Sequence, residues 1–539
     1  MSALLYIPDS ATTVTPAPAV LAVHGYINSR ETQSPYAIEL SRRGYVVLAI
    51  DQRGHGYSDP PAFADGFGGP AGLEYLRNLD FVDVDQIVLT GHSMGGWAVL
   101  SAAAAHPDDY EAVIVSGSST GLFGVPEGDK QFPRNFAVLY GQYDELSAFM
   151  WGSPTAKGIV NTEKLKKIFG TDATVEAGKL YGNVAEGTAR KLYQPAQTHP
   201  ANHITHSGIA GVLDWVQTTT TAPDPINPDD QVWQWKEFGT LVSLAGGILF
   251  LFAFGGFGLT LPLFAGIAGG SKSDVGIKGK GWWLAAAFFV CIPALTYFPL
   301  QQWASTWPAN RWLSQNFTTG FMVWALCVGL ISTVLFLLWH FLLGGKRAGG
   351  DLQTYGLSWP DGSTVKNLLL SLLLAIVVVA GLYGLLLLVD FIFLTDFRWW
   401  IYALKLMNRM HFGIFLGYVV PFSIFFLIVG VVLHGQLGGT TNDSLTKIMF
   451  RNSILMGLGI FLLLAWLYIP LFTNGMLALP DQGLLAIIAM QFVVLLPLTG
   501  LISTYFFCKT GHVYLGAFIN GLFLTWLIVA GQATHYPFQ

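Results

Sequence analysis

The first 217 residues alternate short apolar runs with segments of helical periodicity. Between several of these runs lie segments with apolar residues at helical spacing, such as 34–44 and 95–107. Apolar runs separated by helices are typical of a parallel sheet that helices cover on both faces. The pattern therefore predicts an α/β fold over residues 1–217. The predicted strands and the turns that follow them lie at 2–8, 17–26, 44–59, 86–93, 110–119, 135–145 and 189–195.

The pattern changes at about residue 218. The stretch 218–230 carries prolines at 223, 225 and 228 and has no apolar periodicity, which is typical of a linker. Beyond it lie apolar runs long enough for helices that cross a bilayer, which needs about 20 residues. The sequence therefore predicts an α/β domain at 1–217, a linker at 218–236 and an all-α transmembrane bundle of about eight helices at 237–539. We place the spans near 238–260, 282–302, 318–343, 367–390, 411–435, 452–473, 483–507 and 512–531.

One segment of the second part has a mixed character. Residues 395–411, TDFRWWIYALKLMNRMH, combine aromatic side chains with Arg398, Lys405 and Arg409. This mixture predicts an amphipathic helix at the membrane surface rather than a further span.

Composition separates the same two parts. Residues 1–235 hold 25 Asp and Glu against 14 Lys and Arg, a net charge of −11, whereas the remainder holds 8 against 14, a net charge of +6. The three cysteines, Cys291, Cys327 and Cys508, all lie in the apolar part, so the first part has neither a disulfide framework nor a thiol nucleophile. We expect no nucleic-acid partner, no metal and no organic cofactor.

The stretch IVLTGHSMGGWAVL contains a serine between two glycines, where a predicted strand meets a predicted helix. A tight strand-to-helix turn needs small neighbours, and it lifts the serine hydroxyl clear of the sheet. The amide of the next residue then points toward an oxyanion that forms on an attacked carbonyl. Gly91, Ser93 and Gly95 fit this pattern, so we predict Ser93 as a nucleophile and the Met94 amide as an oxyanion donor.

Other motifs follow in a fixed order along the chain. A strand ends at His24-Gly25-Tyr26, where the Tyr26 amide is the candidate second oxyanion donor, DQRGHGYSD follows the next strand, and YGQYDE places Asp144 after a later one. Together with the serine motif, they resemble those of the α/β-hydrolase superfamily over about 40% of the chain. The resemblance implies a doubly wound, mostly parallel sheet. It also implies a catalytic triad in the chain order nucleophile, acid, histidine, with Ser93 and Asp144 as its first two members.

The histidine of that triad has several candidates. Residues 197–217 offer His199, His203 and His206 ahead of the last predicted helix, which Thr205 or Ser207 would cap. The resemblance implies a catalytic histidine about six residues before that cap. We therefore favour His199, keep His203 as the alternative base, and interpret His206 as a surface residue.

The sequence departs from the superfamily pattern at two places. About fifty residues separate Asp144 from the histidine loop, where an insertion could roof the pocket, whereas the usual cap position, 116–134, is short. In addition, the start of the chain falls directly before what looks like the second strand of the superfamily. Either the first strand is absent or a longer natural product exists.

The charges of the short loops predict an orientation. Nine Lys and Arg lie in 271–280, 344–366, 436–451 and 508–511, against four in the alternate loops, which places the first set in the cytoplasm. The hydrolase-like domain would then lie outside a bacterial-type plasma membrane. The start of the chain, MSALLYIPDS, does not look like a signal peptide, which argues for the opposite side.

Two functional hypotheses follow. The first is a membrane-bound serine hydrolase that cleaves a carboxylic ester, thioester or amide, most simply a lipid-like ester in or near the bilayer. The second is a transporter or sensor whose hydrolase-like domain only binds a ligand. Intramembrane charged residues are few, which favours the bundle as an anchor and platform for a greasy substrate.

Overall fold

The computed structural model describes residues 1–269, 275–438 and 443–538. The chain divides into two compact units. Unit 1 comprises Met1–Gly239, Trp466–Ile487 and Gly531–Gln539, and unit 2 comprises Thr240–Ala465 and Ile488–Ala530. Unit 1 therefore recruits two segments from the C-terminal half of the sequence.

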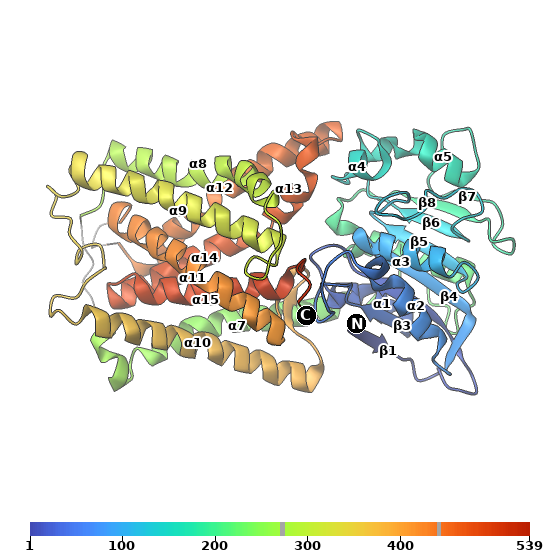
Figure 1. Cartoon of the computed structure of the whole chain (residues 1–539), viewed down its shortest axis with the longest axis horizontal. Coiled ribbons are helices and arrows are strands. Elements are labelled where there is room, and N and C mark those ends of the chain that lie inside the picture. The colour runs from blue at the N-terminus through green and yellow to red at the C-terminus, as the bar shows by residue number, and fades with distance from the viewer. Residues whose placement is uncertain (270–274, 439–442, 539) are drawn as a thin grey trace. The chain divides into compact units, whose positions relative to one another are not determined.

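Unit 1 contains an eight-stranded sheet in the order β1-β3-β2-β4-β5-β6-β8-β7 (Figure 1). All neighbouring strands pair in parallel except β1 with β3 and β7 with β8 at the two edges. The mostly parallel sheet and its place at the start of the chain confirm the predicted α/β-hydrolase fold. The strands are β1 Ala3–Tyr6, β2 Ala17–Val23, β3 Val46–Ile50, β4 Val82–His92, β5 Ala112–Ser116, β6 Phe136–Leu139, β7 Leu180–Tyr181 and β8 Arg190–Tyr193.

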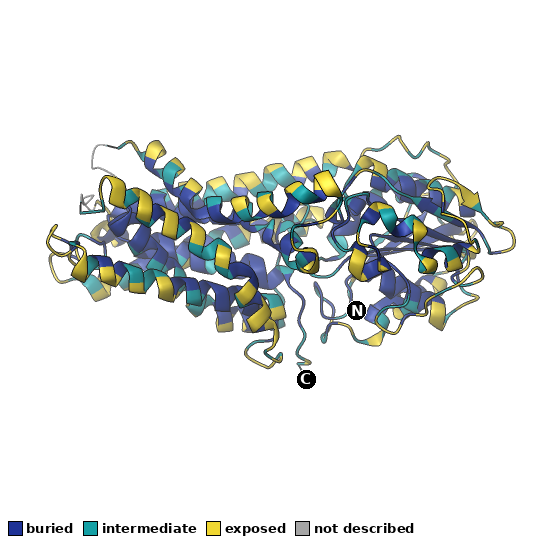
Figure 2. Ribbon diagram, turned by 90° about the horizontal axis from the view of Figure 1, so that it is seen from above, coloured by how far each residue is buried: buried dark blue, intermediate teal, exposed yellow. Residues whose placement is uncertain are grey.

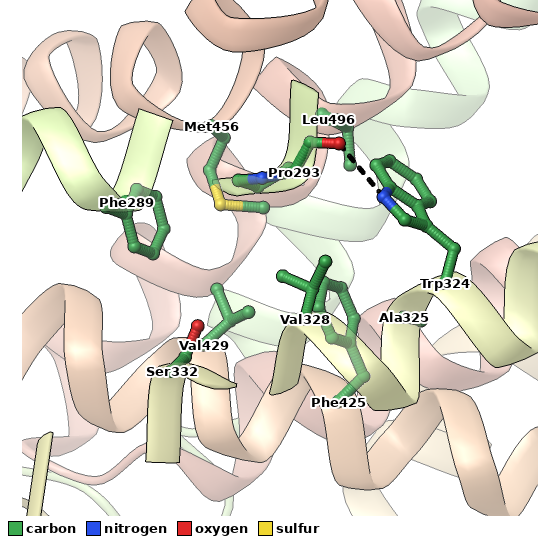
Figure 3. A pocket seen from close by; sticks show the side chains of 10 residues that line it. All are labelled: Phe289, Pro293, Trp324, Ala325, Val328, Ser332, Phe425, Val429, Met456 and Leu496. Carbon is green, nitrogen blue, oxygen red and sulfur yellow. Dashed lines mark hydrogen bonds between the residues drawn. The ribbon is translucent and has the colours of Figure 1, made fainter. Parts of the chain in front are cut away.

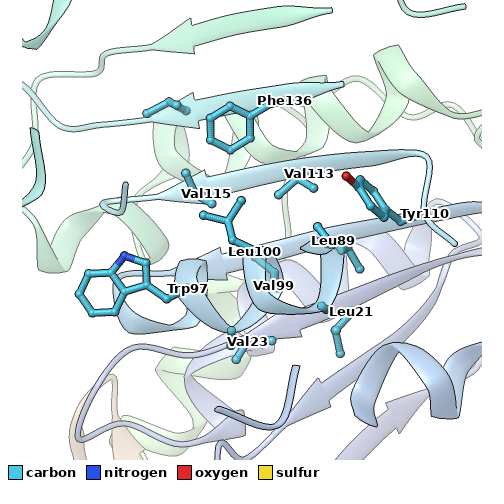
Figure 4. Packing of buried hydrophobic residues seen from close by; sticks show 14 of the residues in the cluster. Leu21, Val23, Leu89, Trp97, Val99, Leu100, Tyr110, Val113, Val115 and Phe136 are labelled. Carbon is cyan, nitrogen blue, oxygen red and sulfur yellow. The ribbon is translucent and has the colours of Figure 1, made fainter. Parts of the chain in front are cut away.

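Both faces of this sheet are buried, which explains why its strands have near-continuous apolar sequences. Alternate residues of a strand point to opposite faces. On β2, Val20 and Ala22 pack with α1 (Ser34–Arg42) and α6 (His206–Thr219), whereas Leu21 and Val23 pack with α2 (Gly69–Arg77) and α3 (Met94–Ala105). Figure 4 shows the second of these clusters between α3 and the strands.

The insertion between Asp144 and the histidine loop is ordered. It contains α4 (Ser147–Trp151), a 3-10 helix at Ala156–Asn161, α5 (Glu163–Phe169) and the short strand β7. Leu165 and Ile168 of α5 are fully buried in the core of the sheet. The insertion is therefore an integral part of the domain.

The predicted linker is held against the first helix. Helix α6 ends at Thr219 and the next helix begins at Gln234. The buried Arg43 guanidinium donates to the carbonyl oxygens of Ile226, Asn227 and Asp230 at 2.6–3.2 Å. These hydrogen bonds give fixed positions to a proline-rich segment that has no secondary structure.

Unit 2 is formed by long apolar helices, and eight helical segments of the described chain are long and apolar enough to cross a membrane. They confirm the predicted all-α region. Figure 2 shows many exposed positions along these helices. Large apolar side chains such as Leu342 and Phe391 are 72% and 83% exposed. The segments are α7 Gln234–Gly258, α8 Lys280–Ser305, α9 Asn316–Leu342, α10 Thr364–Phe393, Arg409–Gln436 with α11 Arg409–Val431 and the π-helical turn Val432–Gln436, α12 Leu445–Asn474, Pro480–Thr510 with α13 Gly483–Ala489 and α14 Phe492–Thr510, and α15 Tyr514–Gly531.

A small cavity lies in the interior of this bundle where α8, α9 and α11 meet. Its volume is about 30 Å³, and Figure 3 shows its apolar lining together with the hydrogen bond from the Trp324 indole to the Pro293 carbonyl oxygen, 3.0 Å long. Such a volume has room for about one water molecule.

The four loops rich in Lys and Arg meet at one end of unit 2. The Ile277 amide donates to the Gln436 carbonyl oxygen at 2.8 Å, and the Gly269 amide donates to that of Lys509 at 3.0 Å. The ring of Trp359 in the second loop stacks on that of His512, the residue directly after the fourth loop, with 3.6 Å between the ring centroids. Residues 271–274 of the first loop and 439–442 of the third lie outside the described residues. Clustering of these loops is what alternating spans require.

The predicted amphipathic helix at 395–411 is wrong. This segment forms a hairpin of β9 (Phe397–Trp399) and β10 (Tyr402–Leu404), and Trp400 in its turn has a φ of 55°. Its Arg398 does not face a membrane surface, because the guanidinium is buried in an ion pair with Asp396, with one hydrogen bond of 2.6 Å. The ion pair with Asp396 lets Arg398 be buried in this hairpin. The pattern of residue types along the sequence does not show that the two side chains pair.

Candidate active site

Ser93 lies on a sharp turn between β4 and α3. Its φ of 53° and ψ of −121° are strained for a residue with a side chain. A Cβ atom at Gly91 would collide with the Gly95 carbonyl oxygen, and one at Gly95 would collide with that of Val23. The Ser93 amide donates to the Ser116 carbonyl oxygen at 2.8 Å. The glycines thus permit a turn that the adjoining strand holds in place, as the sequence motif predicts.

Asp144 and His199 form a buried pair. Asp144 Oδ2 lies 2.9 Å from His199 Nδ1 and also accepts from the side-chain Nδ2 of Asn202 at 3.1 Å. The other oxygen, Oδ1, accepts from the Tyr140 hydroxyl at 3.0 Å and from the Leu146 amide at 2.9 Å. A carboxylate with these partners has a fixed orientation, and it orients the imidazole in turn.

The electrostatic surroundings of His199 favour its protonated form. Burial opposes the positive charge on the ring, but Asp144, through its charge and its hydrogen bond, and then Glu145 outweigh burial, so the pKa of His199 is raised. A base with a raised pKa accepts a proton more readily.

The His199 ring lies close to the serine turn. A Cβ atom at Gly117, in the loop after β5, would lie 3.0 Å from His199 Nδ1. The His92 ring, in the residue just before Ser93, lies 4.9 Å from the His199 ring, and its Nε2 is 3.1 Å from the His199 carbonyl oxygen. The structure therefore brings together the three regions that carry Ser93, Asp144 and His199.

The alternative histidines have different surroundings. The His203 ring is buried against that of His92, with 4.0 Å between the ring centroids, and burial followed by the charge of His199 lowers the pKa of His203 to about 3. His206 begins α6 with a half-exposed side chain, and its Nε2 lies 2.9 Å from the Asp229 carbonyl oxygen. Of the three candidates, His199 is the one hydrogen-bonded to Asp144.

The candidate oxyanion donors border the same turn. Met94 is the first residue of α3, where helix amides have no intrahelical acceptor. A Cβ atom at Gly25 would lie 3.2 Å from Ser93 Cβ, so the turn that carries Tyr26 touches the serine. The oxyanion roles of Tyr26 and Met94 stay predictions.

Ser93 opens into a cavity of about 550 Å³ within unit 1. Five of its fifteen lining residues are aromatic, and the Trp97 and Phe123 rings lie 4.5 Å apart. Its two charged lining residues are Glu145 and Asp481, both acidic. The remaining lining residues are Tyr26, Phe63, Met94, Leu146, Ala148, Phe149, Met150, Pro480, Gly483 and Leu484.

Glu145, the residue after Asp144, contacts both the candidate base and a distant part of the chain. Its Oε2 accepts from the His199 amide at 2.7 Å, and its Oε1 accepts from the Tyr468 hydroxyl at 2.9 Å. Burial, and then the neighbouring charge of Asp144, raise the pKa of Glu145 to about 7. Tyr468 lies in an apolar run far along the chain, and no local pattern marks it as a neighbour of this site.

The C-terminal tail reaches the other side of the site. The Thr534 amide donates to the Gly54 carbonyl oxygen at 2.7 Å, and the Tyr26 hydroxyl lies 2.7 Å from His535 Nε2. Burial lowers the pKa of His535 to about 4, so its ring is neutral at pH 7. Among the described residues, no group of three or more His, Cys, Asp or Glu side chains is arranged to hold a metal ion.

Two family models match parts of unit 1. A model described as serine aminopeptidase, S33 matches residues 15–126, and one described as putative esterase matches residues 78–181. The first match includes the serine turn and the second includes both the serine turn and Asp144.

Curated relatives match a similar region. A 2-(acetamidomethylene)succinate hydrolase of Mesorhizobium japonicum is 34% identical over 104 residues, which are 18% of this chain and 34% of that protein. A monoacylglycerol lipase of Mycolicibacterium smegmatis is 33% identical over 110 residues, 19% of this chain and 38% of that protein. The chain spans little more than a third of the length of these relatives.

Solved structures resemble the same part. A bacterial heroin esterase matches with a TM-score of 0.29 and 13% identity over 40% of this chain and 77% of that one. A 2,6-dihydroxy-pseudo-oxynicotine hydrolase matches with a TM-score of 0.29 and 19% identity over 42% of this chain and 66% of that one.

Proposed function

We propose that this protein is a membrane-bound serine hydrolase that cleaves carboxylic esters. The observation that carries the proposal is the strained turn that presents Ser93 to the cavity beside the Asp144–His199 pair. The matches to hydrolase families support it.

The proposed reaction uses an acyl-enzyme. The Ser93 oxygen attacks the ester carbonyl carbon while His199 Nε2 takes the hydroxyl proton, and the Tyr26 and Met94 amides bind the oxyanion. The intermediate collapses, the bond to the alkoxy oxygen breaks, and the leaving alcohol takes the proton from His199. Water, deprotonated by His199, then attacks the acyl group, which leaves as a carboxylic acid and restores Ser93. Asp144 orients the ring throughout.

The proposed substrate is an uncharged or cationic ester with a large apolar group. A cavity of this volume with aromatic rings in its lining favours apolar ligands, and its two ionisable acidic residues, Asp481 and Glu145, offer no positive charge to an anionic one. A lipid-like ester that partitions into a bilayer fits both properties.

We also propose that the protein lies in a membrane, with its hydrolase domain outside the cytoplasm of a bacterial-type cell; the eight long apolar helices support the membrane location. The clustering of four Lys- and Arg-rich loops at one end of unit 2 supports this orientation, because such loops favour the cytoplasmic side.

The function is tested by ester turnover. Purified full-length protein should hydrolyse a nitrophenyl ester, and Ser93→Ala should lower kcat by about a million-fold with an unchanged fold. Ser101→Ala, on the same helix as the turn, is the matched control and should keep the wild-type rate. Wild-type turnover by Ser93→Ala would refute the proposal.

A further inference from the structure

The segment Trp466–Ile487 contacts the acid–base side of the site at several points. Besides the hydrogen bond from Tyr468 to Glu145, the Phe472 ring packs edge-on against the Tyr143 ring at 5.4 Å. A Cβ atom at Gly475 would lie 3.3 Å from the Thr155 methyl group. These contacts extend from residue 143 to residue 155, on both sides of Asp144.

The same segment forms one wall of the substrate cavity. Pro480, Asp481, Gly483 and Leu484 line the cavity together with Ser93. Gly483 packs so closely that a Cβ atom there would lie 2.7 Å from the Glu145 carbonyl oxygen and 2.9 Å from a methyl carbon of Leu146. The wall is therefore built onto the residues that directly follow the candidate acid.

Glu145 connects this segment to the candidate base. The carboxylate bridges the Tyr468 hydroxyl and the His199 amide, and it is only 7% exposed. A buried carboxylate that loses a donor loses a charge-assisted hydrogen bond, and its orientation is no longer fixed. The Tyr468 hydroxyl thereby determines how firmly Glu145 holds the backbone of His199.

We propose that the segment Trp466–Ile487 is part of the active site, with Tyr468 and Glu145 as positioning residues for His199 and Leu484 as a residue that determines substrate size. The inference rests on the proposed function, because it assigns roles around Ser93 and His199. It extends that function, because the catalytic site is completed by a segment that begins in a predicted membrane span.

The positioning role is tested with Tyr468→Phe in the full-length protein. The ring and its packing remain, so we expect an intact fold and an unchanged KM for a short-chain nitrophenyl ester, with kcat about tenfold lower from the lost charge-assisted hydrogen bond. Tyr505→Phe, in unit 2, is the matched control and should keep the wild-type kcat.

A double-mutant cycle separates positioning from general stability. If Tyr468 acts through Glu145, Tyr468→Phe should not reduce kcat further in a Glu145→Ala background. Additive losses in the double variant, or a wild-type kcat in Tyr468→Phe, would overturn the positioning role.

The size-selecting role is tested by Leu484→Trp. A larger side chain on this wall should lower kcat/KM for a nitrophenyl ester of a long fatty acid at least tenfold relative to the acetate ester. Leu249→Trp, on the exposed face of α7, should leave that ratio unchanged. An unchanged ratio in Leu484→Trp would refute the assigned wall.

These outcomes are distinct from failure of the proposed function. If wild-type turnover does not depend on Ser93, the function itself fails. If turnover depends on Ser93 while the Tyr468 and Leu484 variants behave as wild type, only the present inference fails.

Discussion

His199 Nδ1 lies 2.9 Å from Asp144 Oδ2, and both side chains are buried. Because the carboxylate is a hydrogen-bond acceptor beside Nδ1, it favours the tautomer of His199 that carries its proton on Nδ1. Nε2 is then free of a proton and can accept one. The side-chain Nδ2 of Asn202 and the Tyr140 hydroxyl also donate hydrogen bonds to this carboxylate and fix its orientation. The pair thus has the fixed, buried arrangement that the proposed roles of Asp144 and His199 require of these two residues.

Substitutions of this pair should disable the enzyme to different degrees. Asp144→Asn should lower kcat by about 10⁴-fold, because the imidazole is held in the wrong tautomer. His199→Ala should lower it further, whereas His203→Ala should retain most activity if the fold is intact. The kcat of each variant for hydrolysis of a nitrophenyl ester measures these losses. An inactive His203→Ala beside a normal His199→Ala would show that His203 is the base.

Glu145 should influence the pH dependence of catalysis. It raises the pKa of His199, whose ring must be neutral to act as a base, so Glu145→Gln should lower that pKa and move the acid limb of kcat/KM to lower pH. The other groups that face the ring are Asp144, His92 and His203. Because the pKa of Glu145 is itself raised to about 7, the wild-type limb should also be broader. A limb that stays in place, or moves to higher pH, would contradict this role.

The glycine after the serine turn should not tolerate a methyl group. Gly95→Ala forces a Cβ atom against the Val23 carbonyl oxygen, so either the turn or the strand must shift. We expect at least a hundredfold loss of kcat/KM, since displacements of about 1 Å have that effect on positioned groups. Gly246→Ala, which has open space at its Cβ position, is the control. Wild-type kinetics in Gly95→Ala would mean that the turn is not under this constraint.

The fold could largely be predicted from sequence because its signals are local. Buried parallel strands such as β2 and β5 are near-continuous apolar runs, and spans are long apolar runs, so both are visible in windows of a few residues to about twenty. The hairpin at 397–404 was not predicted, because its buried ion pair of Asp396 and Arg398 has no signature in the local pattern of residues.

The candidate site likewise combines features that a local motif predicts with contacts between residues far apart in the sequence. Gly91-His92-Ser93-Met94-Gly95 is a contiguous motif, and the turn it forms agrees with the sequence. Tyr468 is separated from Glu145 by 323 residues, and the sequence carries no sign of their hydrogen bond. Such contacts form only when distant parts of the chain fold together, so no local pattern of residues marks them.

The linker attachment should contribute to stability through a buried ion pair. Glu39 and Arg43 are fully buried, 2.9 Å apart, and Glu39 also accepts from the amides of Val232 and Trp233. Glu39→Ala leaves the guanidinium without its counter-charge and should cost about 3–5 kcal/mol. Thermal unfolding and protease cleavage within 220–233 would report the loss. Glu163→Ala, which removes a side chain that is 90% exposed, should change neither.

Orientation in the membrane can be tested on intact cells that express the chain from its natural upstream region. The proposed topology predicts that added protease digests residues 1–235 while the loop 344–366 stays protected. The net charge of −11 on residues 1–235 agrees with a location away from the anionic cytoplasmic leaflet. A protected hydrolase domain with an accessible 344–366 loop would reverse the orientation and make cytoplasmic esters the expected substrates.

The most direct test of the proposed chemistry is covalent labelling of the serine. A fluorophosphonate probe reacts with an activated serine hydroxyl, and mass spectrometry of the full-length protein in membranes identifies the modified residue. We predict a single adduct on Ser93 that is absent in Ser93→Ala and strongly reduced in His199→Ala. An unlabelled Ser93 in membranes where a known serine hydrolase is labelled would contradict the assignment, and would favour a domain that binds its ligand without cleaving it.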